Sequence, residues 1–367
     1  MPDVLIIGAG IVGCAAGEAL THQGASVGFI DPRGVGLGAT QASAGMLTPY
    51  TEGLHHPVLE ALGLRSLWLW DAFVDRLFDG RIPGHIYARR GSLDIAMDDT
   101  EAAELQTLAH AHEARGVASR YLKGGDAKQL ERDVTADCVG ALLIPAHGYA
   151  NAPAVTGALW RACESRGAQV TRASVHRIQP TANGLTVQTS EGRLSAPTVV
   201  LAAGSWVGQI AIDDVDPLPV NPVRGQLLYL KWPEPALSHI VWGSRCYAVP
   251  WPDGTLLVGA TLEDVGFDAR ATVAGVRDLL DSVCELLPRA WQAGFLGARV
   301  GLRPGSPDAL PIIGRSSRVR GLVYATGHYR NGVLLAPLTA DLIAQIIRGD
   351  ESDPALPLVS PSRLGDY

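Results

Sequence analysis

The sequence has few charged side chains and lacks any run of basic residues. Charged residues make up 18% of the 367 positions, against roughly 25% in typical soluble domains, whereas hydrophobic residues reach 47%. The net charge is −7, and without a lysine or arginine run the chain offers no nucleic-acid surface. This composition favours a compact enzyme with buried strands and excludes a disordered or coiled-coil protein.

Signals for secretion and for membrane insertion are also missing. The chain enters an apolar strand without a basic region or a cleavage site before it, so we expect no signal peptide. Its uncharged stretches, 4–17 and 138–160, are too short and glycine-rich or are interrupted by proline, so we expect no membrane span. The five cysteines are scattered, without C-x-x-C or metal-ligand spacing, which fits reduced thiols. We therefore expect a cytoplasmic protein.

A glycine-rich turn directly follows the first predicted strand, Val4–Ile7. It reads Gly8-Ala9-Gly10-Ile11-Val12-Gly13. Gly8 allows a tight turn, Gly10 lets the backbone approach a pyrophosphate, and Gly13 lets the next helix pack closely on the sheet. The following strand ends in Asp31, whose carboxylate is placed to accept hydrogen bonds from a ribose. The pattern predicts a dinucleotide-binding fold.

Further signals of this fold return in the middle and at the end of the chain. The apolar run 198–204 is typical of a buried parallel strand, and strand 322–326 precedes a predicted helix over 331–348. Alternating segments between them indicate antiparallel strands. We therefore predict an α/β protein, with a loosely ordered tail after residue 350. Its discontinuous FAD-binding domain comprises 1–85, 148–217 and 301–367, and its mainly antiparallel substrate domain comprises 86–147 and 218–300.

FAD suits this arrangement better than a nicotinamide cofactor, because its flavin end lies well beyond the first glycine turn and needs the second set of elements. The chain resembles the D-amino-acid-oxidase-like family of flavoproteins and, within it, the glycine oxidases of thiamine biosynthesis. The stretches that carry the resemblance are Val4–Gly13, Ala39–Leu47, Thr198–Trp206, Pro222–Gln226, Cys246–Pro250, Gly301–Gly305, Pro311–Gly314 and Gly327–Gly332. The resemblance implies FAD, small amino-acid substrates, dioxygen as acceptor and a homotetramer. The segment Gly301–Gly314 contains no cysteine, so we expect the FAD to be bound non-covalently.

The resemblance also implies a set of site residues. Arg303 lies among glycine, proline and leucine, and a planar guanidinium matches a carboxylate bidentately, so it is the candidate anchor for the substrate carboxylate. The other candidate substrate residues are Arg330, Tyr247, Met46 and Leu262. The candidate cofactor residues are Gly8, Gly10, Ile11, Val12, Gly13, Asp31, Pro32, Ala39, Thr40, Ala44, Gly45, Met46, Val175, Gly204, His328, Tyr329, Arg330, Asn331, Gly332, Val333 and Leu334.

Each of these assignments has a structural alternative. Tyr247 alone would be an ordinary core tyrosine, and Arg330 would be a residue that caps a turn. We expect free N–H groups at Asn331–Val333, where the last helix should begin. Leu262 and Thr48 depart from the pattern of glycine oxidases, which leaves the preferred amine open.

A metal site is not predicted. His55, His56 and Glu60 lack a further ligand with suitable spacing, and a surface pair is the interpretation we favour.

The chemistry expected is hydride transfer from glycine, or from a small N-alkylglycine, to the flavin, with no general base required. The products would be glyoxylate, ammonia or an amine, and hydrogen peroxide. The alternatives are a D-amino-acid oxidase, a sarcosine-type oxidase, a quinone-linked dehydrogenase, and a flavin-binding protein without turnover.

Overall fold

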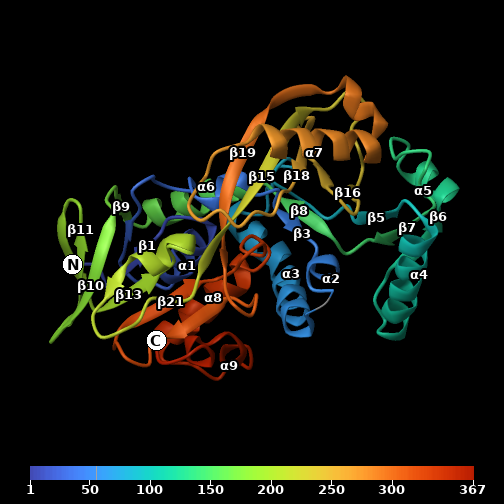
Figure 1. Cartoon of the computed structure of the whole chain (residues 1–367). Helices are drawn as coiled ribbons and strands as arrows, with labels where there is room; N and C mark the ends of the chain where they lie inside the picture. Colours follow the sequence, from blue (N-terminus) through green and yellow to red (C-terminus); the bar gives the residue numbers. More distant parts are fainter. Residues whose placement is uncertain (55) are drawn as a thin grey trace.

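The computed structural model describes residues 1–54 and 56–367 and is organised around two large sheets (Figure 1). The first sheet has six strands in the order β20-β21-β13-β1-β2-β9. All neighbouring pairs are parallel except β20 and β21. The strands are β1 (Val4–Ile7), β2 (Val27–Ile30), β9 (Gln169–Thr171), β13 (Thr198–Leu201), β20 (Ile312–Arg315) and β21 (Leu322–Thr326).

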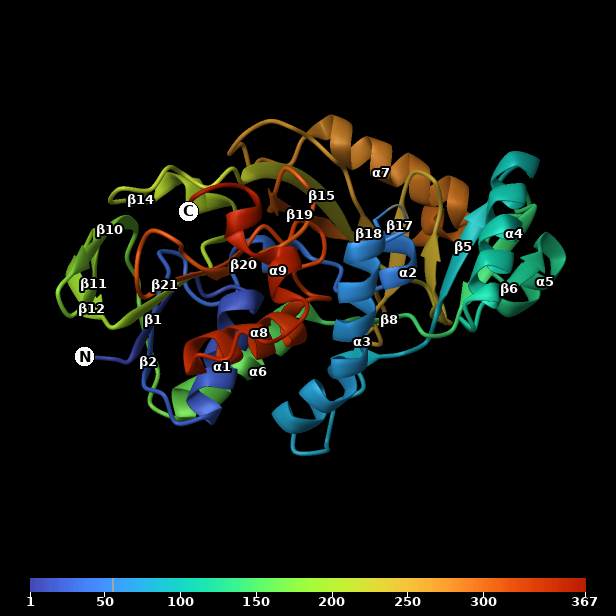
Figure 2. The same cartoon turned by 90° about the horizontal axis from the view of Figure 1, so that it is seen from below.

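Both faces of this sheet are covered. Helices α1 (Ile11–His22), α6 (Ala152–Ser165) and α8 (Ala336–Arg348) lie together on one face (Figure 2). The other face packs against a four-stranded sheet of β10 (Val175–Thr181), β11 (Gly184–Thr189), β12 (Gly192–Ala196) and β14 (Ala211–Ile212). Side chains of β1 alternate between the two layers, as strand geometry requires: Val4 and Ile6 join the helical core, and Leu5 and Ile7 join the other core.

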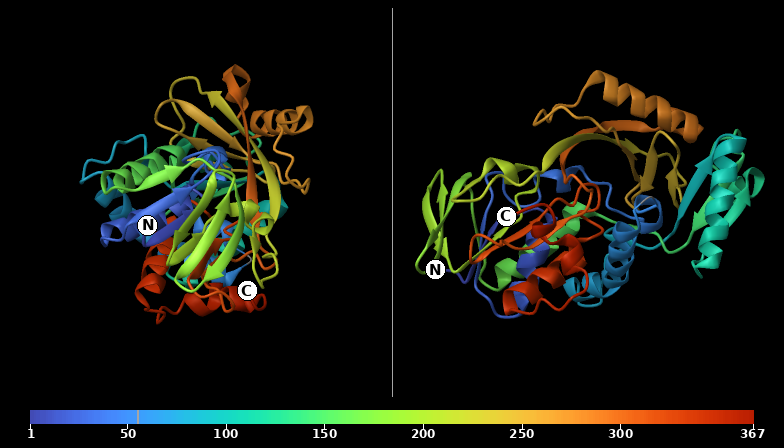
Figure 3. Two further views of the ribbon diagram at one scale, coloured as in Figure 1. Left: turned by 90° about the vertical axis from the view of Figure 1, so that its left-hand side faces the viewer. Right: turned by 60° about the horizontal axis from the view of Figure 1, so that its bottom comes forward.

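The second sheet has eight strands in the order β19-β15-β18-β17-β16-β5-β7-β6, and its curved half arches over the first sheet (Figure 3). Helices α7 (Val273–Leu286), α4 (Asp99–Ala114) and α5 (Gly124–Leu130) pack against its strands. Parallel pairing of β16 with β5 joins the strands of 92–144 to those of 221–305, so two separate stretches of chain make one sheet. The strands are β5 (Ser92–Ala96), β6 (Arg120–Lys123), β7 (Gly140–Ile144), β15 (Asn221–Lys231), β16 (Ile240–Trp242), β17 (Tyr247–Pro250), β18 (Thr255–Gly259) and β19 (Gly294–Gly305).

Short elements complete the molecule. A three-stranded sheet contains β3 (Met46–Leu47), β8 (Gly148–Ala150) and β4 (Tyr87–Ala88). The helical segments are η1 (Ala39–Ala42), α2 (Pro49–Glu52), α3 (Pro57–Leu77), η2 (Gly204–Gln209), η3 (Pro288–Gln292), α9 (Leu356–Val359) and η4 (Pro361–Arg363). Both the parallel and the antiparallel sheets are present, which confirms the predicted α/β class.

One predicted domain boundary lies inside a strand. Residue 301 falls within β19, which pairs with β15 as far as Gly305. We propose that the substrate domain extends to that residue.

The structure corrects two predicted features at the end of the chain. Helix α8 begins at Ala336, five residues later than predicted, because the backbone of 332–335 forms turns first. The tail after residue 350 is packed, not loose. Arg65 holds Asp353 through two hydrogen bonds of 2.6 and 2.5 Å, and Arg363 binds Asp308.

The structure describes two of the three residues that were considered, and not predicted, as a metal site near residue 55. His55 lies outside the described residues. The ring of His56 accepts a hydrogen bond from the Leu59 N–H at the start of α3. The side chain of Glu60 is buried and forms an ion pair with Arg115. The sequence spacing does not indicate this ion pair, because Arg115 follows α4 and lies far from Glu60 in the chain.

Candidate active site

A cavity of about 680 Å³ lies between the two large sheets. One end is formed by the carboxyl ends of β1, β2, β13 and β21, and the other by residues of β16, β17, β19 and the segment after β18. Ligands of α/β sheets bind at such carboxyl ends. We therefore describe a cofactor end and a substrate end of one continuous cavity.

The glycine turn leaves open space only where a ligand must approach. Gly8 has a φ of +107°, and a Cβ there would lie 2.3 Å from the Ala202 carbonyl oxygen. A Cβ at Gly13 would lie 2.0 Å from the Gly8 oxygen, so Gly13 serves helix packing and does not line the cavity. Gly10, in contrast, has only the Thr40 hydroxyl nearby, at 3.3 Å. The turn thus presents bare backbone to the cavity at Gly10.

Helix α1 starts at this turn, and its own first turn contributes no anion. Its N-cap residue, Gly10, provides no side-chain hydrogen bond, and its first turn carries no acidic residue. The free N–H groups and the positive dipole end of such a helix bind phosphate groups. The cofactor end therefore fits a dinucleotide pyrophosphate.

Asp31 lies where β2 ends and is 6% exposed. Its carboxylate accepts hydrogen bonds from the backbone N–H groups of Ala9 (3.0 Å), Arg33 (2.9 Å) and Gly34 (3.2 Å). Asp31 also lines the cavity. It therefore joins the glycine turn to the end of β2, and binding of a ribose by this carboxylate stays a prediction.

Arg33 and Trp206 were missed by the sequence prediction. The Arg33 guanidinium lies over the Trp206 indole, 3.8 Å from its centroid, and burial lowers the pKa of this arginine. Its Nε is buried without a hydrogen-bond partner among the described residues. Both residues line the cavity, and the fold brings them together although they are far apart in the sequence.

At the substrate end, Arg303 has no acidic partner among the residues that the structure describes. Its Nη1 donates to the carbonyl oxygens of Arg224 (3.2 Å) and Thr261 (3.1 Å). Tyr247 lines the same cavity, and burial raises the pKa of its phenol to about 12 although Arg303 and Arg330 oppose this shift. The phenol therefore stays protonated and able to donate.

Arg330 differs from Arg303 because an acid neutralises it. Its Nη2 lies 2.8 Å from the carboxylate of Glu52 on α2, whose side chain is 7% exposed. Burial alone would lower the pKa of Arg330, but Glu52 reverses the direction and the pKa is raised. Glu52 lines the cavity and was also missed by the sequence prediction, since nothing in its short helix distinguishes it.

Most of the candidate cofactor residues in the loop before α8 line the cavity. His328 is buried, its Nε2 lies 3.0 Å from the Thr339 hydroxyl, and burial lowers its pKa to about 4. The N–H of Asn331 donates to the His328 carbonyl at 2.8 Å, so it is not free as predicted. Leu334 lies outside the cavity, because its side chain belongs to the helical core and its carbonyl accepts from Ser66 and Trp70.

Nearly all predicted site residues meet in this one cavity. Those that line it are Gly8, Gly10, Ile11, Val12, Asp31, Pro32, Ala39, Thr40, Ala44, Gly45, Met46, Val175, Gly204, Tyr247, Leu262, Arg303, His328, Tyr329, Arg330, Asn331, Gly332 and Val333. Gly13 and Leu334 do not. Their roles toward a ligand stay predictions.

The fold and the glycine turn at the cavity are those of a dinucleotide-dependent enzyme. The family model described as FAD dependent oxidoreductase matches residues 3–346, and the chain belongs to this family. FAD is therefore its cofactor, and the open backbone at Gly10 and the absence of an acidic residue from the first turn of α1 fit its pyrophosphate.

Comparison with individual proteins shows which members of this family the chain is similar to. The chain is 33% identical over 353 residues to "Glycine oxidase" from Geobacillus kaustophilus, covering 95% of this chain and 94% of that protein. It is 34% identical to "Bifunctional protein ThiO/ThiG" from Nostoc sp., covering 96% of this chain but 54% of that protein. The crystal structure of the Geobacillus kaustophilus glycine oxidase superimposes with a TM-score of 0.92 at 32% identity, over 99% of this chain and 98% of that one.

A second solved structure is similar over the whole length. Iminodiacetate oxidase from Chelativorans sp. superimposes with a TM-score of 0.88 at 28% identity, over 99% of this chain and 100% of that one. Within the described residues, no helix has both the length and the apolarity needed to cross a membrane.

Proposed function

We propose that this protein oxidises glycine, or a small N-substituted glycine, to glyoxylate and ammonia or an amine, with hydrogen peroxide as the second product. The observation that carries the proposal is Arg303, a cavity arginine without an acidic partner among the described residues, which shares its cavity with the cofactor end. Bound FAD would accept the hydride from the substrate Cα and pass the electrons to dioxygen.

The side chains at the substrate end bind and orient. Arg303 uses Nη1 for backbone carbonyls, which leaves its remaining N–H groups for a bidentate contact with the substrate carboxylate. The protonated phenol of Tyr247 donates to the same carboxylate. Arg330, already paired with Glu52, shapes the cavity wall without competing for the anion. Positioning of this kind needs no general base in the protein.

N-substituted glycines are a second candidate for the substrate. One structural relative is iminodiacetate oxidase from Chelativorans sp., and iminodiacetate is a glycine with a carboxymethyl group on its nitrogen. Leu262 lines the cavity and is 63% exposed, so the wall is open at this point and can admit a substituent.

A peroxide-coupled assay of the purified holoenzyme tests the substrate class. We expect turnover of glycine, sarcosine and iminodiacetate with higher kcat/KM than of D-phenylalanine. Because one methylene is worth only about 1–3 kcal/mol of discrimination, some turnover of D-alanine is also expected. A kcat/KM for D-phenylalanine far above that for glycine would replace the proposal with a D-amino-acid oxidase. Peroxide formation is itself part of the result, since a quinone-linked dehydrogenase would produce none.

The FAD is proposed to be non-covalent. Cys246 lines the cavity, but burial raises the pKa of its thiol to about 12, and the thiolate is the nucleophilic form. Acid precipitation should therefore release all yellow colour into the supernatant, and colour in the pellet would contradict this.

The assembly, the compartment and the pathway complete the proposal. A homotetramer and a role in thiamine biosynthesis rest on the resemblance to glycine oxidases. A cytoplasmic location is supported by the five cysteines, all free thiols and four of them buried. Light scattering coupled to size exclusion should give four times the mass of the chain.

A further inference from the structure

Two backbone carbonyls orient Arg303 in its cavity. Nη1 donates to the oxygens of Arg224 and Thr261. A Cβ at Gly225 would lie 2.2 Å from Nη2, so the guanidinium lies against the backbone of β15. No ion pair with a described residue restrains it. The direction of its free N–H groups therefore depends on where these two carbonyls are held.

The two carbonyls belong to different segments. Arg224 lies on β15, and Thr261 lies in the segment that follows β18. The backbone of Glu263 connects them, because its N–H donates to the Arg224 oxygen (3.0 Å) and its oxygen accepts from the Arg224 N–H (2.9 Å). The Arg224 oxygen thus accepts from both Glu263 and Arg303.

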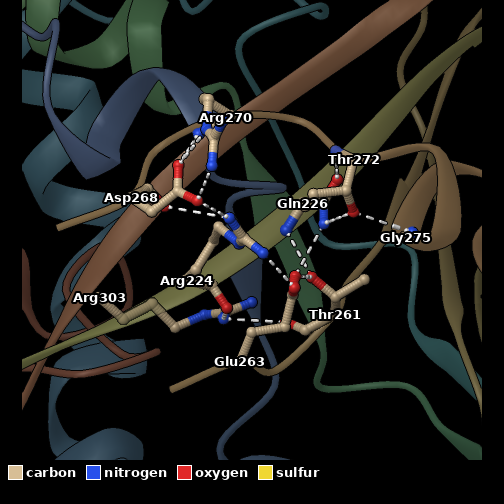
Figure 4. A network of polar contacts seen from close by, with 9 residues as sticks. All are labelled: Arg224, Gln226, Thr261, Glu263, Asp268, Arg270, Thr272, Gly275 and Arg303. Atoms are coloured by element: carbon tan, nitrogen blue, oxygen red, sulfur yellow. Dashed lines mark hydrogen bonds and ion pairs between the residues drawn. The ribbon is translucent and has the colours of Figure 1, made fainter. Parts of the chain in front are cut away.

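The Glu263 side chain connects the same segments a second time (Figure 4). Its carboxylate accepts from Arg224 Nη2 (2.5 Å), Gln226 Nε2 (2.8 Å) and the Thr261 hydroxyl (2.6 Å). The Thr261 hydroxyl in turn accepts from the backbone N–H of Gln226 (2.9 Å). One carboxylate therefore fixes both residues whose carbonyls hold Arg303.

The charges around Glu263 are balanced without Arg303. Arg224 is 4% exposed and is paired with Glu263 and, at 3.1 Å, with Asp268. Asp268 also pairs with Arg270. The Arg224 hydrogen bond lowers the pKa of Glu263 to about 2, so the carboxylate is charged throughout the neutral range. The positive charge of Arg303 is left for the cavity.

We propose that Glu263 is a positioning residue for carboxylate recognition. It fixes Arg224 and Thr261 so that their carbonyls point the Arg303 guanidinium at the substrate. This inference rests on the proposed function, in which Arg303 binds the substrate carboxylate. It adds a residue that touches neither substrate nor cofactor.

The test compares Glu263→Gln with Asp268→Asn in the FAD-loaded enzyme. Both changes remove one carboxylate charge beside Arg224, but Asp268 does not contact Thr261 or Gln226. Glycolate, a carboxylate without an amine, is titrated by the change in flavin absorbance, and glycine turnover is measured in parallel. We expect Glu263→Gln to raise the glycolate Kd and the KM for glycine about tenfold with kcat changed less than about threefold, and Asp268→Asn to change each less than about twofold.

Combination with Arg303→Ala separates positioning from a general structural role. If Glu263 acts through Arg303, adding Glu263→Gln to Arg303→Ala changes the glycolate Kd by less than about twofold. An additional loss as large as in the wild-type background would overturn the proposal. So would equal effects of Glu263→Gln and Asp268→Asn, while the anchor role of Arg303 would stand. If Arg303→Ala binds glycolate as the wild type does, the proposed anchor fails, and the role of Glu263 fails with it.

A second variant tests the positioning role of Glu263 if Glu263→Gln does not retain FAD. Thr261→Val keeps the Thr261 carbonyl and removes the hydroxyl that lies between Glu263 and the Gln226 N–H. We expect its glycolate Kd to rise at least about threefold, because one buried hydrogen bond that restrains the carbonyl is lost. A wild-type Kd for this variant would overturn the proposal.

Discussion

The six-stranded sheet and the eight-stranded sheet contribute to the same cavity in different ways. In the six-stranded sheet, both faces are covered by other layers, and the cavity is lined mainly by backbone and small residues at the ends of strands, such as Gly8 and Gly10. In the eight-stranded sheet, polar side chains lie along the strands themselves, as Arg303 on β19 and Tyr247 on β17 do.

The difference follows from how each sheet is covered. A parallel sheet between two layers has no polar face, so a ligand meets it only where strands end. An antiparallel sheet can leave one face open, and every second residue is then available to a ligand. The cofactor end should therefore be sensitive to added atoms, and the substrate end to removed charges and hydroxyls.

The largest effect is expected at Gly8. Gly8→Ala places a methyl group 2.3 Å from the Ala202 oxygen and forces a residue with a Cβ into a positive φ. Gly24→Ala is the matched control, because Gly24 also has a positive φ (+89°) but has nothing within 4 Å of the added carbon. The backbone penalty of about 1–2 kcal/mol is shared, whereas the clash is not. We expect Gly8→Ala to be insoluble or colourless and Gly24→Ala to keep a full complement of FAD, measured by visible absorbance.

The next effect is expected at Arg303. Arg303→Ala removes a bidentate, charge-assisted contact worth about 1.5–3 kcal/mol per hydrogen bond, so kcat/KM for glycine should fall about 10²–10⁴-fold with FAD retained. Arg330→Ala instead leaves the buried carboxylate of Glu52 without its partner and should lower the melting temperature. An Arg303→Ala enzyme with unchanged kcat/KM would remove the distinction between the two arginines.

A smaller effect concerns stability of the eight-stranded sheet. Asp94 on β5 is buried beside the hydroxyls of Thr51 (3.0 Å) and Ser92 (3.4 Å), and burial raises its pKa from near 4 to about 7. Between these values the native state holds a proton that the unfolded state has lost. The contribution of Asp94 to the free energy of unfolding should therefore fall as the pH rises from about 4 to 7, by at most about 1.4 kcal/mol per pH unit.

Asp94→Asn removes that dependence, because an amide does not titrate. We expect the stability of the variant relative to wild type to increase between pH 4 and pH 7 and to be constant above, measured by urea denaturation at several pH values. His147, whose pKa burial lowers to about 3, shares the Ser92 hydroxyl with Asp94, so the difference reports the titration of this hydrogen-bonded group. Asp137→Asn, at an exposed position just before β7, is the control. A pH-independent difference for Asp94→Asn would contradict the prediction.

The smallest effect is expected at Tyr247. Tyr247→Phe removes one neutral donor from the cavity, worth about 0.5–1.5 kcal/mol, so the KM for glycine should rise about two- to twelvefold. Tyr229→Phe is the control, because Tyr229 lies on β15 of the same sheet as Tyr247 but does not line the cavity. The Tyr229 hydroxyl instead donates to the Gln41 carbonyl (3.3 Å). Equal kinetics for the two variants would show that Tyr247 is a core residue.

Much of the cofactor end could be predicted from the sequence because it is local. The glycine spacing, the strand before it and Asp31 after it lie within the first 31 residues, and each follows from backbone sterics or helix dipoles. The start of α8 was misplaced because the turns over 332–335 precede it, and the packing of the tail was missed because Arg65 and Asp353 are far apart in the chain.

The sequence by itself determined the periodic strands, the glycine turn and the residue types available for binding a carboxylate, because these depend on neighbours along the chain. Only the tertiary structure decided which charges remain for a ligand. Glu52 neutralises Arg330 and the Glu263 network surrounds Arg224, while Arg303 keeps its charge. Such pairings join residues that are tens to hundreds of positions apart, and an ion pair depends on distance in space, for which sequence spacing is no guide.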